Sequence, residues 1–536
     1  ELAAHMLGFA NRIGHGCEGV EGMFDKYLAC VPGEQRFRVD ARRNVLESLT
    51  LEYIEPEGGD TVILTLDKAL QHALERELDA AMVRVEAPRA MGLIIDQRTG
   101  ALLALACRAA FDPNRYSEYP PELLKNRALV DVFEPGSSFK IVTASAALER
   151  GLITTETMID CENGSFNPYG HRIHDYHSMG VEPFRRCFAQ SSNIAMIKVG
   201  AMLGPEPLYE WIRRYGFGDA ASKEFTTESR GILRPSSQWT KYSMGALPMG
   251  QEVSVTMLQL ARAFSVVANG GYLVTPYILE RAVSPEGQVT YEHDHSPPPQ
   301  ILSPATAEIM KNLCHLVVTE GTGTTANIAE YRVGGKTGTA QIARPGGGGY
   351  LPDKYTAVFA GFAPIADPRY CAVIVIQEPG IRQRWGGYCC GPVFKAVIRE
   401  ALIRENCPED PVAEPVKEGE TVAEEAPAAM TLASATPADQ EASAPLDGLE
   451  LMPLHEAAEG EPVLPSLIGL TKNQARQKLS ELGLHGDFYG AGRVVSQDPP
   501  QATPLAEVTL CRLEFSSGAS ETIPSESEGT GANTPL

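Results

Sequence analysis

The chain has 536 residues, of which 43% are hydrophobic, and carries a formal net charge of −22 at pH 7. This length allows two to four domains, and the apolar fraction is sufficient for a buried core. The acidic excess argues against electrostatic attraction to nucleic acids or to anionic membrane surfaces. We therefore expect no nucleic-acid partner.

The chain contains no run of about 18 apolar residues, so none of its segments is expected to span a bilayer. It begins at Glu1, without a methionine or a signal peptide. We therefore expect a fragment that has lost its N-terminus.

The eleven cysteines are scattered and include no Cys-x-x-Cys pattern. This distribution indicates neither a metal knuckle nor a disulfide framework, and we expect mostly buried free thiols. One or two bridges stay open as an alternative in an oxidising compartment. Three histidines lie near Asp175, namely His171, His174 and His177, but without a clean ligand spacing they are read as loop residues. We expect no metal and no cofactor.

Strand and helix patterns occur near both ends of the first 405 residues. Residues 61–66 predict a strand, Asp67 caps a predicted helix over 68–85, and the apolar runs 90–95 and 101–107 predict a hairpin. Three later strands are predicted over 331–342, 355–363 and 370–377, followed by an amphipathic helix over 391–405. The hairpin strands and the three later strands, five in all, have hairpin-type connections and indicate one antiparallel sheet. A mainly helical insert separates the two groups of strands. The expected fold class is α+β.

The insert begins with the segment Glu134-Pro135-Gly136-Ser137-Ser138-Phe139-Lys140. Pro135 and Gly136 end the preceding element and place Ser137 in the first turn of a helix. A spacing of three puts Ser137 and Lys140 on one face, about 5–6 Å apart at their Cβ atoms, which suits proton transfer. A helix N-terminus also favours an alkoxide and a developing oxyanion. Taken alone, such a serine is more often a helix cap.

Two further motifs favour a catalytic role for Ser137 over a capping role. They are Gln190-Ser191-Ser192-Asn193-Ile194 and Gly335-Lys336-Thr337-Gly338-Thr339-Ala340-Gln341. The ordered set Ser-x-x-Lys, Ser-x-Asn and Lys-Thr-Gly is the signature of penicillin-binding proteins and serine β-lactamases. The chain resembles the class B penicillin-binding proteins, most closely the cell-division (FtsI-like) D,D-transpeptidases.

This resemblance implies a peptidoglycan D,D-transpeptidase that works through a serine acyl-enzyme in septal cell-wall synthesis. It also implies that β-lactams acylate the serine and inhibit the enzyme. The implied catalytic residues are Ser137 as nucleophile, Lys140 as base and Ser191 as proton relay. The implied substrate-binding residues are Asn193, Lys336, Thr337, Gly338 and Thr339. An elongation-type transpeptidase, a D,D-carboxypeptidase, a β-lactamase, a β-lactam sensor that does not turn over and a non-catalytic scaffold stay open as alternatives.

The resemblance also implies a domain order. Residues 1–85 would close a pedestal (dimerisation-like) domain, and 86–406 would form the transpeptidase domain. An acidic, Ala/Pro/Glu-rich segment at 407–461 is expected to be a disordered linker. Residues 462–515 resemble a small α+β PASTA domain, and 516–536 read as a flexible tail.

The implied partners are stem peptides ending in D-Ala-D-Ala, β-lactams, a membrane glycan polymerase of the FtsW type and other division proteins. The implied location is the extracytoplasmic (periplasmic) face of the cell membrane, with an anchoring transmembrane helix preceding Glu1. One further segment, Trp385-Gly386-Gly387-Tyr388, reads equally as the mouth of the cleft or as a surface turn.

Overall fold

A computed structural model describes residues 1–39, 42, 45–170, 172–344, 349–410, 464–482, 484, 486–490, 493–499 and 511–516. The linker predicted at 407–461 lies outside these residues from position 411 onward, and the predicted tail does so from position 517. The chain divides into two units, Glu1–Glu420 and Thr421–Leu536, and each is treated by itself. Within the described residues, no helix is both long enough and apolar enough to cross a bilayer.

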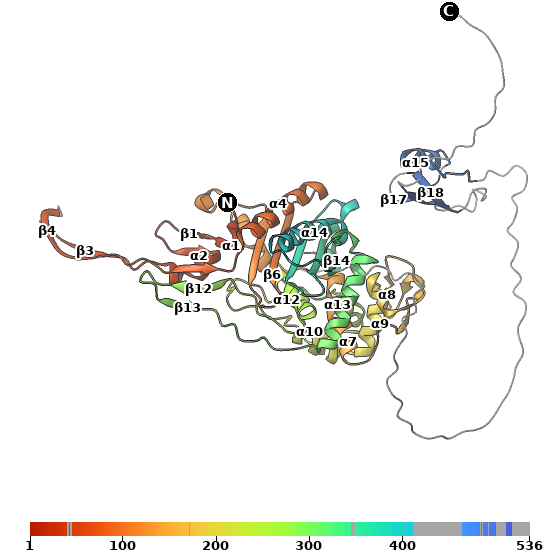
Figure 1. Ribbon diagram of the computed structural model, residues 1–536, viewed down its shortest axis with the longest axis horizontal. Helices are drawn as coiled ribbons and strands as arrows, with labels where there is room; N and C mark the ends of the chain where they lie inside the picture. The colour runs from red at the N-terminus through yellow and green to blue at the C-terminus, as the bar shows by residue number, and fades with distance from the viewer. Residues whose placement is uncertain are drawn as a thin grey trace, which may run out of the picture. The chain divides into compact units, whose positions relative to one another are not determined.

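A five-stranded antiparallel sheet forms the centre of the first unit (Figure 1). Its strands are β6 (Arg89–Asp96), β7 (Leu102–Arg108), β14 (Gly334–Ala343), β15 (Tyr350–Ala363) and β16 (Tyr370–Gln377). The strand order β14-β15-β16-β6-β7 joins the two predicted strand groups through β16 and β6 and leaves β14 at an edge. The predicted α+β class is confirmed, and the five predicted strands do form one antiparallel sheet, although smaller sheets accompany it.

Helices cover both faces of this sheet. Because side chains alternate along a strand, Val373 and Val375 of β16 belong to the apolar cluster on one face, and Ile374 and Ile376 belong to the cluster on the other. The first face packs on α12 (Met257–Ala268), and the second packs on α4 (Lys68–Val85) and α14 (Gly386–Arg404). Burial on both faces explains why the strands read as continuous apolar runs.

The predicted start of α4 is confirmed, whereas that of α14 is wrong. The Asp67 carboxylate accepts hydrogen bonds from Ala69 N (2.8 Å) and Leu70 N (2.9 Å), as expected of a cap. Helix α14 begins at Gly386, five residues before the predicted position 391. Glycines disfavour a helix on propensity, but here close packing requires one, because a Cβ on Gly386 would lie 2.3 Å from the carbonyl oxygens of Gly338 and Val358.

The chain before α4 forms short helices and five strands, of which β1 pairs with β2 and β3 pairs with β4. They are α1 (Ala4–Leu7), β1 (Phe9–Ala10), β2 (Gly16–Glu18), α2 (Gly19–Met23), α3 (Asp25–Leu28), β3 (Glu34–Val39), β4 (Val45–Ile54) and β5 (Thr61–Leu64). The strand predicted at 61–66 is β5. It pairs with β12 (Leu279–Val283), which also pairs with β13 (Val289–Glu292), and is therefore not part of the central sheet.

The insert between β7 and β14 is mainly helical, as predicted. Its remaining helices are η1 (Pro113–Glu118), α5 (Pro121–Leu124), α6 (Arg127–Val130), η2 (Gly136–Phe139), α7 (Lys140–Glu149), η3 (Glu162–Gly164), α8 (Phe184–Ala189), α9 (Asn193–Leu203), α10 (Pro205–Arg214), η4 (Ser236–Gln238), α11 (Lys241–Ala246), η5 (Leu247–Met249), α13 (Pro304–Thr319) and η6 (Thr324–Ala326). Its short strands are β8 (Met158–Asp160), β9 (Ser165–Phe166), β10 (Ile173–His174) and β11 (Val181–Pro183). A last single turn, η7 (Ile381–Gln383), precedes α14.

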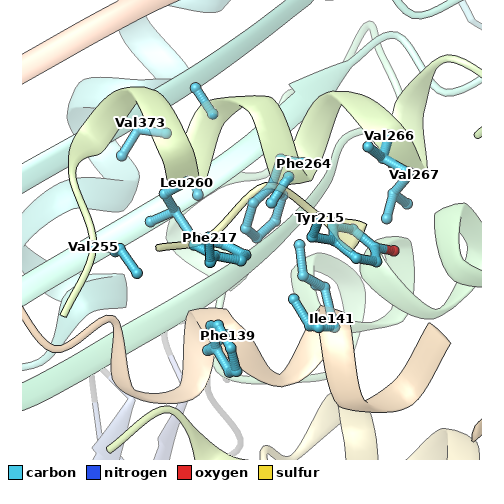
Figure 2. Packing of buried hydrophobic residues seen from close by; sticks show 14 of the residues in the cluster. Phe139, Ile141, Tyr215, Phe217, Val255, Leu260, Phe264, Val266, Val267 and Val373 are labelled. Carbon is cyan, nitrogen blue, oxygen red and sulfur yellow. The ribbon is translucent and has the colours of Figure 1, made fainter. Parts of the chain in front are cut away.

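Helix α12 lies in the apolar layer between the sheet and the helix that follows Ser137. Figure 2 shows Leu260 and Phe264 of α12 between Val373 of β16 and the side chains of Phe139 and Ile141. The Phe139 and Phe217 rings are 5.2 Å apart, and both side chains are buried. Burying a side chain of this size contributes about 1.5–3 kcal/mol, so the segment around Ser137 is held by its neighbours in the core.

The second unit has a small core of its own. It contains α15 (Lys472–Glu481) and a three-stranded sheet of β17 (Gly486–Gly490), β18 (Arg493–Asp498) and β19 (Cys511–Ser516), in the order β17-β19-β18. The buried side chains are Leu464, Leu467, Ala475, Leu479, Val494, Cys511 and Leu513.

Candidate active site

Ser137 lies in the single 3-10 turn η2, directly before α7. The turn crosses another backbone segment closely, since Gly136 N donates to Gly250 O at 3.0 Å and a Cβ on Gly250 would lie 2.0 Å from Gly136 O. Both glycines have positive φ angles, 51° and 86°, which L side chains rarely adopt. Ser137 is half-buried, and none of the described residues hydrogen-bonds its hydroxyl.

Glu134 secures the same turn from the other side. Its carboxylate accepts hydrogen bonds from Glu252 N (3.0 Å) and from the Tyr350 hydroxyl (3.0 Å). Burial raises the pKa of the Glu134 carboxyl above its ordinary value. Contacts from two distant segments therefore position the residues that lead into Ser137.

Lys140 is fully buried at the start of α7 and points to the Ser191–Asn193 segment. Its Nζ donates to Ser191 O (2.7 Å), Ser191 Oγ (3.2 Å) and Asn193 Oδ1 (2.8 Å). These are the three acceptors that an ammonium group can serve. The structure thus brings three of the predicted site residues into direct contact.

The pKa of Lys140 lies well below its usual range. Burial is the main cause, the charge of Lys336 lowers the pKa further, and the Asp175 carboxylate opposes both. Burial also lowers the pKa of Lys336, to about 7. Burial and the neighbouring charge of Lys336 favour the neutral form of the Lys140 amine, which a general base requires.

The Ser191–Asn193 segment forms a strained turn at the start of α9. Ser191 has a φ of 61°, a left-handed conformation that costs a non-glycine residue about 1–3 kcal/mol. Asp175, from a loop 18 residues upstream, accepts hydrogen bonds from Asn193 N (2.6 Å), Ile194 N (3.1 Å) and Ser192 Oγ (2.5 Å). Its carboxylate therefore caps α9 and offsets the strain. The sequence analysis assigned Asp175 no role, because no local pattern links it to a helix so far along the chain.

Edge strand β14 carries the Lys-Thr-Gly motif beside η2. Alternation points Thr337 and Thr339 to one face of the strand and Lys336 and Gly338 to the other. A Cβ on Gly338 would lie 2.5 Å from Pro135 O, so the strand meets the turn before Ser137 at a glycine. The structure does not bring the Lys336 amine into the cleft: the amine is buried, with no hydrogen-bond partner among the described residues.

A cleft of about 520 Å³ opens over these elements. Ser137, Ser191, Asn193, Thr337 and Thr339 line it. Two further residues contribute: sequence reasoning missed Thr322, and it named Gly386 only within a segment that could line the cleft mouth. Thr322 shares a 2.6 Å hydrogen bond between its hydroxyl and that of Thr337, and Gly386 donates its backbone N–H to Thr339 Oγ1 at 3.0 Å. Both fix the threonine side chains of β14.

Aromatic side chains meet at the rim of the cleft. The rings of Tyr176 and Trp385 are 4.7 Å apart in an edge-to-face arrangement, although they come from distant segments. The cleft is lined by the whole segment Trp385, Gly386, Gly387 and Tyr388. This segment therefore forms part of the cleft mouth, the first of the two interpretations given above. His174 and His177 lie at the rim and His171 lies outside the described residues. Elsewhere in the described part of the chain, no group of three His, Cys, Asp or Glu side chains is arranged to hold a metal ion.

Two family models match the chain. The penicillin binding protein transpeptidase domain matches residues 90–399, more than half of the chain, and the PASTA domain matches residues 462–510. Penicillin-binding protein PbpB of Mycolicibacterium smegmatis is 33% identical over 422 residues, which make up 76% of this chain and 65% of that protein. Peptidoglycan D,D-transpeptidase FtsI of Escherichia coli is 30% identical over 411 residues, 76% of this chain and 67% of that protein.

A solved structure of similar fold is penicillin binding protein 3 from Mycobacterium tuberculosis, complexed with ampicillin. It has a TM-score of 0.69 and 32% identity to this chain, and the match covers 77% of this chain and 90% of that one. The chain spans 65% of the length of the M. smegmatis relative and 62% of the M. tuberculosis PbpB.

The sheet, the helical insert and the Ser-x-x-Lys cleft, together with these matches, place the chain in the penicillin-binding protein transpeptidase family. Within that family it is of the class B type, with a PASTA domain after the transpeptidase domain. The resemblance stated from the motifs is confirmed.

Proposed function

We propose that this chain is a serine-type peptidoglycan D,D-transpeptidase. The observation that carries the proposal is that Ser137, Ser191 and two β14 threonines line one cleft, with Lys140 held directly beneath Ser191. Relatives named as peptidoglycan D,D-transpeptidases, such as FtsI of Escherichia coli, support the same conclusion.

In the first half-reaction, Ser137 Oγ attacks the carbonyl carbon of the penultimate D-Ala of a stem peptide. The C–N bond to the terminal D-Ala breaks, and the acyl group stays on the serine as an ester. Lys140 accepts the serine proton, and Ser191 passes a proton to the leaving amine. In the second half-reaction, an amine of a neighbouring stem attacks the ester, which forms the cross-link and frees Ser137.

Proton acceptance sets a condition on Lys140. A neutral amine has two hydrogens and one lone pair, whereas Lys140 has three acceptors around it. The base form must therefore give up one of these contacts and turn its lone pair to Ser137. The lowered pKa of Lys140, caused mainly by burial, favours this neutral form.

The oxyanion of the tetrahedral intermediate would be bound by the backbone N–H groups of Ser137 and Thr339. The N–H groups in the first turn of a helix lack intrahelical partners, and losing one such donor costs about 2.7–4 kcal/mol of transition-state stabilisation. Thr337 and Thr339 would bind the substrate carboxylate, and the buried Lys336 amine, when protonated, would add positive charge near Lys140. Asn193 would hold the amide backbone of the stem peptide.

The proposed setting is septal wall synthesis on the extracytoplasmic face of the membrane. The similarity to FtsI of Escherichia coli supports the division role by analogy. The proposed partners are an FtsW-like glycan polymerase and other division proteins, and the proposed anchor is a transmembrane helix preceding Glu1.

The chemistry is tested by intact-protein mass spectrometry after addition of ampicillin. We expect one covalent adduct per chain in the wild type, none in Ser137→Ala, and an unchanged adduct in Ser138→Ala, which removes a neighbouring hydroxyl that donates only to Pro135 O. Adduct formation that survives Ser137→Ala would place the nucleophile elsewhere. Consumption of ampicillin without an adduct would indicate hydrolysis and refute the transpeptidase assignment.

The division role is tested by depleting the protein in its source cell. Filaments without septa are expected, whereas rounded cells that still divide would assign the chain to elongation. Release of D-Ala from a pentapeptide without any cross-linked product in the presence of an acceptor amine would instead identify a carboxypeptidase.

A further inference from the structure

Two buried cysteines meet beside the cleft. The Sγ atoms of Cys161 and Cys187 are 3.6 Å apart, and the two residues are 0% and 1% exposed. Cys161 follows β8, whereas Cys187 lies in α8, so different elements bring them together. Across the described residues, no other pair of thiols is joined by a hydrogen bond. Cys314 and Cys371, equally buried, have no cysteine beside them.

The residues between these cysteines form one wall of the cleft. Positions 162–186 include Asp175, which caps α9, and Tyr176, which meets Trp385 at the rim. The pair is also joined to the Ser191–Asn193 segment. Ser192 Oγ donates to Cys161 Sγ (3.5 Å), and Ser192 N donates to Cys187 O (2.8 Å). A bond between the two sulfurs would therefore close a loop at its base, directly behind the start of α9.

We propose that Cys161 and Cys187 are a redox modification site, at which a small disulfide compound converts two thiols into a disulfide that holds this wall of the cleft. The Cys161 thiolate attacks the small disulfide, which forms a mixed disulfide and releases one thiol. Cys187 then loses its proton and attacks the Cys161 sulfur, which releases the second thiol. The two cysteines are oxidised, and the small disulfide is reduced to two thiols.

The local chemistry favours Cys161 as the attacking group. The hydrogen bond from the Cys187 thiol lowers the pKa of Cys161 below its ordinary value, and Ser192 and Lys198 act in the same direction. By contrast, burial raises the pKa of Cys314 and of Cys371 to about 12. Thiolate character controls the rate of exchange, so these two solitary thiols serve as internal controls.

The turn that covers Cys161 offers a route for the reagent. Its neighbours Asp160, Glu162 and Asn163 are exposed, and Glu162, Asn163 and Gly164 all have positive φ angles. Such a turn opens locally at lower cost than the core does. Bond formation then requires the sulfurs to approach from 3.6 Å to about 2.05 Å, a shift that rotation of the two side chains supplies.

The test treats the folded protein with oxidised glutathione in a background in which the three less buried cysteines, Cys17, Cys30 and Cys407, are replaced by serine. We expect the intact mass to fall by two hydrogen atoms, a digest to yield the 161–187 cross-linked peptide, and the melting temperature to rise by several degrees until a reductant is added. Hydrogen exchange over residues 162–186 should slow on oxidation. Cys161→Ser and Cys187→Ser should each abolish all four changes, and Cys314→Ser should leave them intact.

Several results would overturn the proposal. These are glutathione adducts without the internal bond, a cross-link to any other cysteine, or a cross-link that leaves both the melting temperature and the exchange of residues 162–186 unchanged. If the serine variants fail to fold, differential alkylation of the wild type before and after oxidation detects the Cys161–Cys187 disulfide instead. None of these measurements requires acyl transfer, so they separate this site from the proposed activity.

Discussion

Replacing Asp175 is predicted to weaken both the fold and the acylation step. Its carboxylate accepts two backbone N–H groups and one hydroxyl at the start of α9. A hydrogen bond to a charged group contributes about 1.5–3 kcal/mol and a helix cap about 1 kcal/mol. Because these contributions overlap, Asp175→Ala should lower the free energy of unfolding by about 2–4 kcal/mol. Displacement of Ser191 and Asn193 should slow acylation about 100-fold.

Asp175→Asn separates the charge from the hydrogen bonds. The amide oxygen still accepts both backbone N–H groups, so we expect a smaller loss of stability, about 1 kcal/mol. The carboxylate raises the pKa of Lys140, and its removal lowers that pKa further. The acid limb of the acylation rate, at which Lys140 loses its proton, should therefore move to lower pH.

The assay measures urea unfolding and the second-order rate of acylation by a fluorescent penicillin between acid and neutral pH. Asp112→Ala is the matched control, because Asp112 accepts a backbone N–H at η1 (3.0 Å) away from the cleft residues. The control should acylate at the wild-type rate. An Asp175→Ala variant with wild-type stability and rate, or an Asp175→Asn acid limb that moves to higher pH, would refute the reasoning.

Three further predictions follow from buried groups. Gly386→Ala should destabilise the protein by about 1–3 kcal/mol and slow acylation, because the new Cβ meets two carbonyl oxygens at 2.3 Å. The control is Gly58→Ala, whose Cβ would make only an ordinary contact, 3.8 Å from Pro285 Cγ. Equal melting temperatures for the two variants would contradict the packing. Lys336→Met should raise the melting temperature, since an unpartnered buried amine costs about 1–3 kcal/mol. The same change removes a charge that lowers the pKa of Lys140, so the acid limb of the acylation rate should move to higher pH. A fall in melting temperature would show that the amine is paired. Burial raises the pKa of Glu228 from 4.5 to about 7, so between these pH values the folded state holds a proton that the unfolded state releases. The free energy of unfolding should therefore fall by about 3 kcal/mol as the pH rises from 4.5 to 7. Glu228→Gln should flatten this pH dependence in urea titrations, and an unchanged dependence would assign it to another group.

The sheet could be predicted because its signals are local. Each strand is an apolar run bounded by turn residues, and burial on both faces makes those runs continuous. The same holds for the Asp67 cap, which acts on residues two and three positions ahead. The start of α14 could not be predicted, because Gly386 is selected by a contact with strands far away in sequence.

The motifs supplied the residues of the site but not their surroundings. Ser137, Lys140, Ser191 and Asn193 were found from the ordered motifs and the family resemblance that these motifs carry, and the structure places the latter three in contact. Asp175 and Thr322 were missed, since each acts through a fold-dependent hydrogen bond. The catalytic and binding roles of all these residues stay predictions. The Lys336 amine is buried without a hydrogen-bond partner among the described residues, and Asn193 Oδ1 already accepts from Lys140.

The strand order has a consequence for synthesis of the chain. Strands β14 and β15 pair as a hairpin, but only β16 joins them to β6 and β7. A nascent chain that has not yet exposed β16, and Gly386 behind it, therefore holds Ser137 and Lys140 without the edge strand that completes their cleft. Covalent penicillin labelling of ribosome-bound intermediates would report the chain length at which β16 pairs with β6. The time course of labelling would then follow the folding of the cleft.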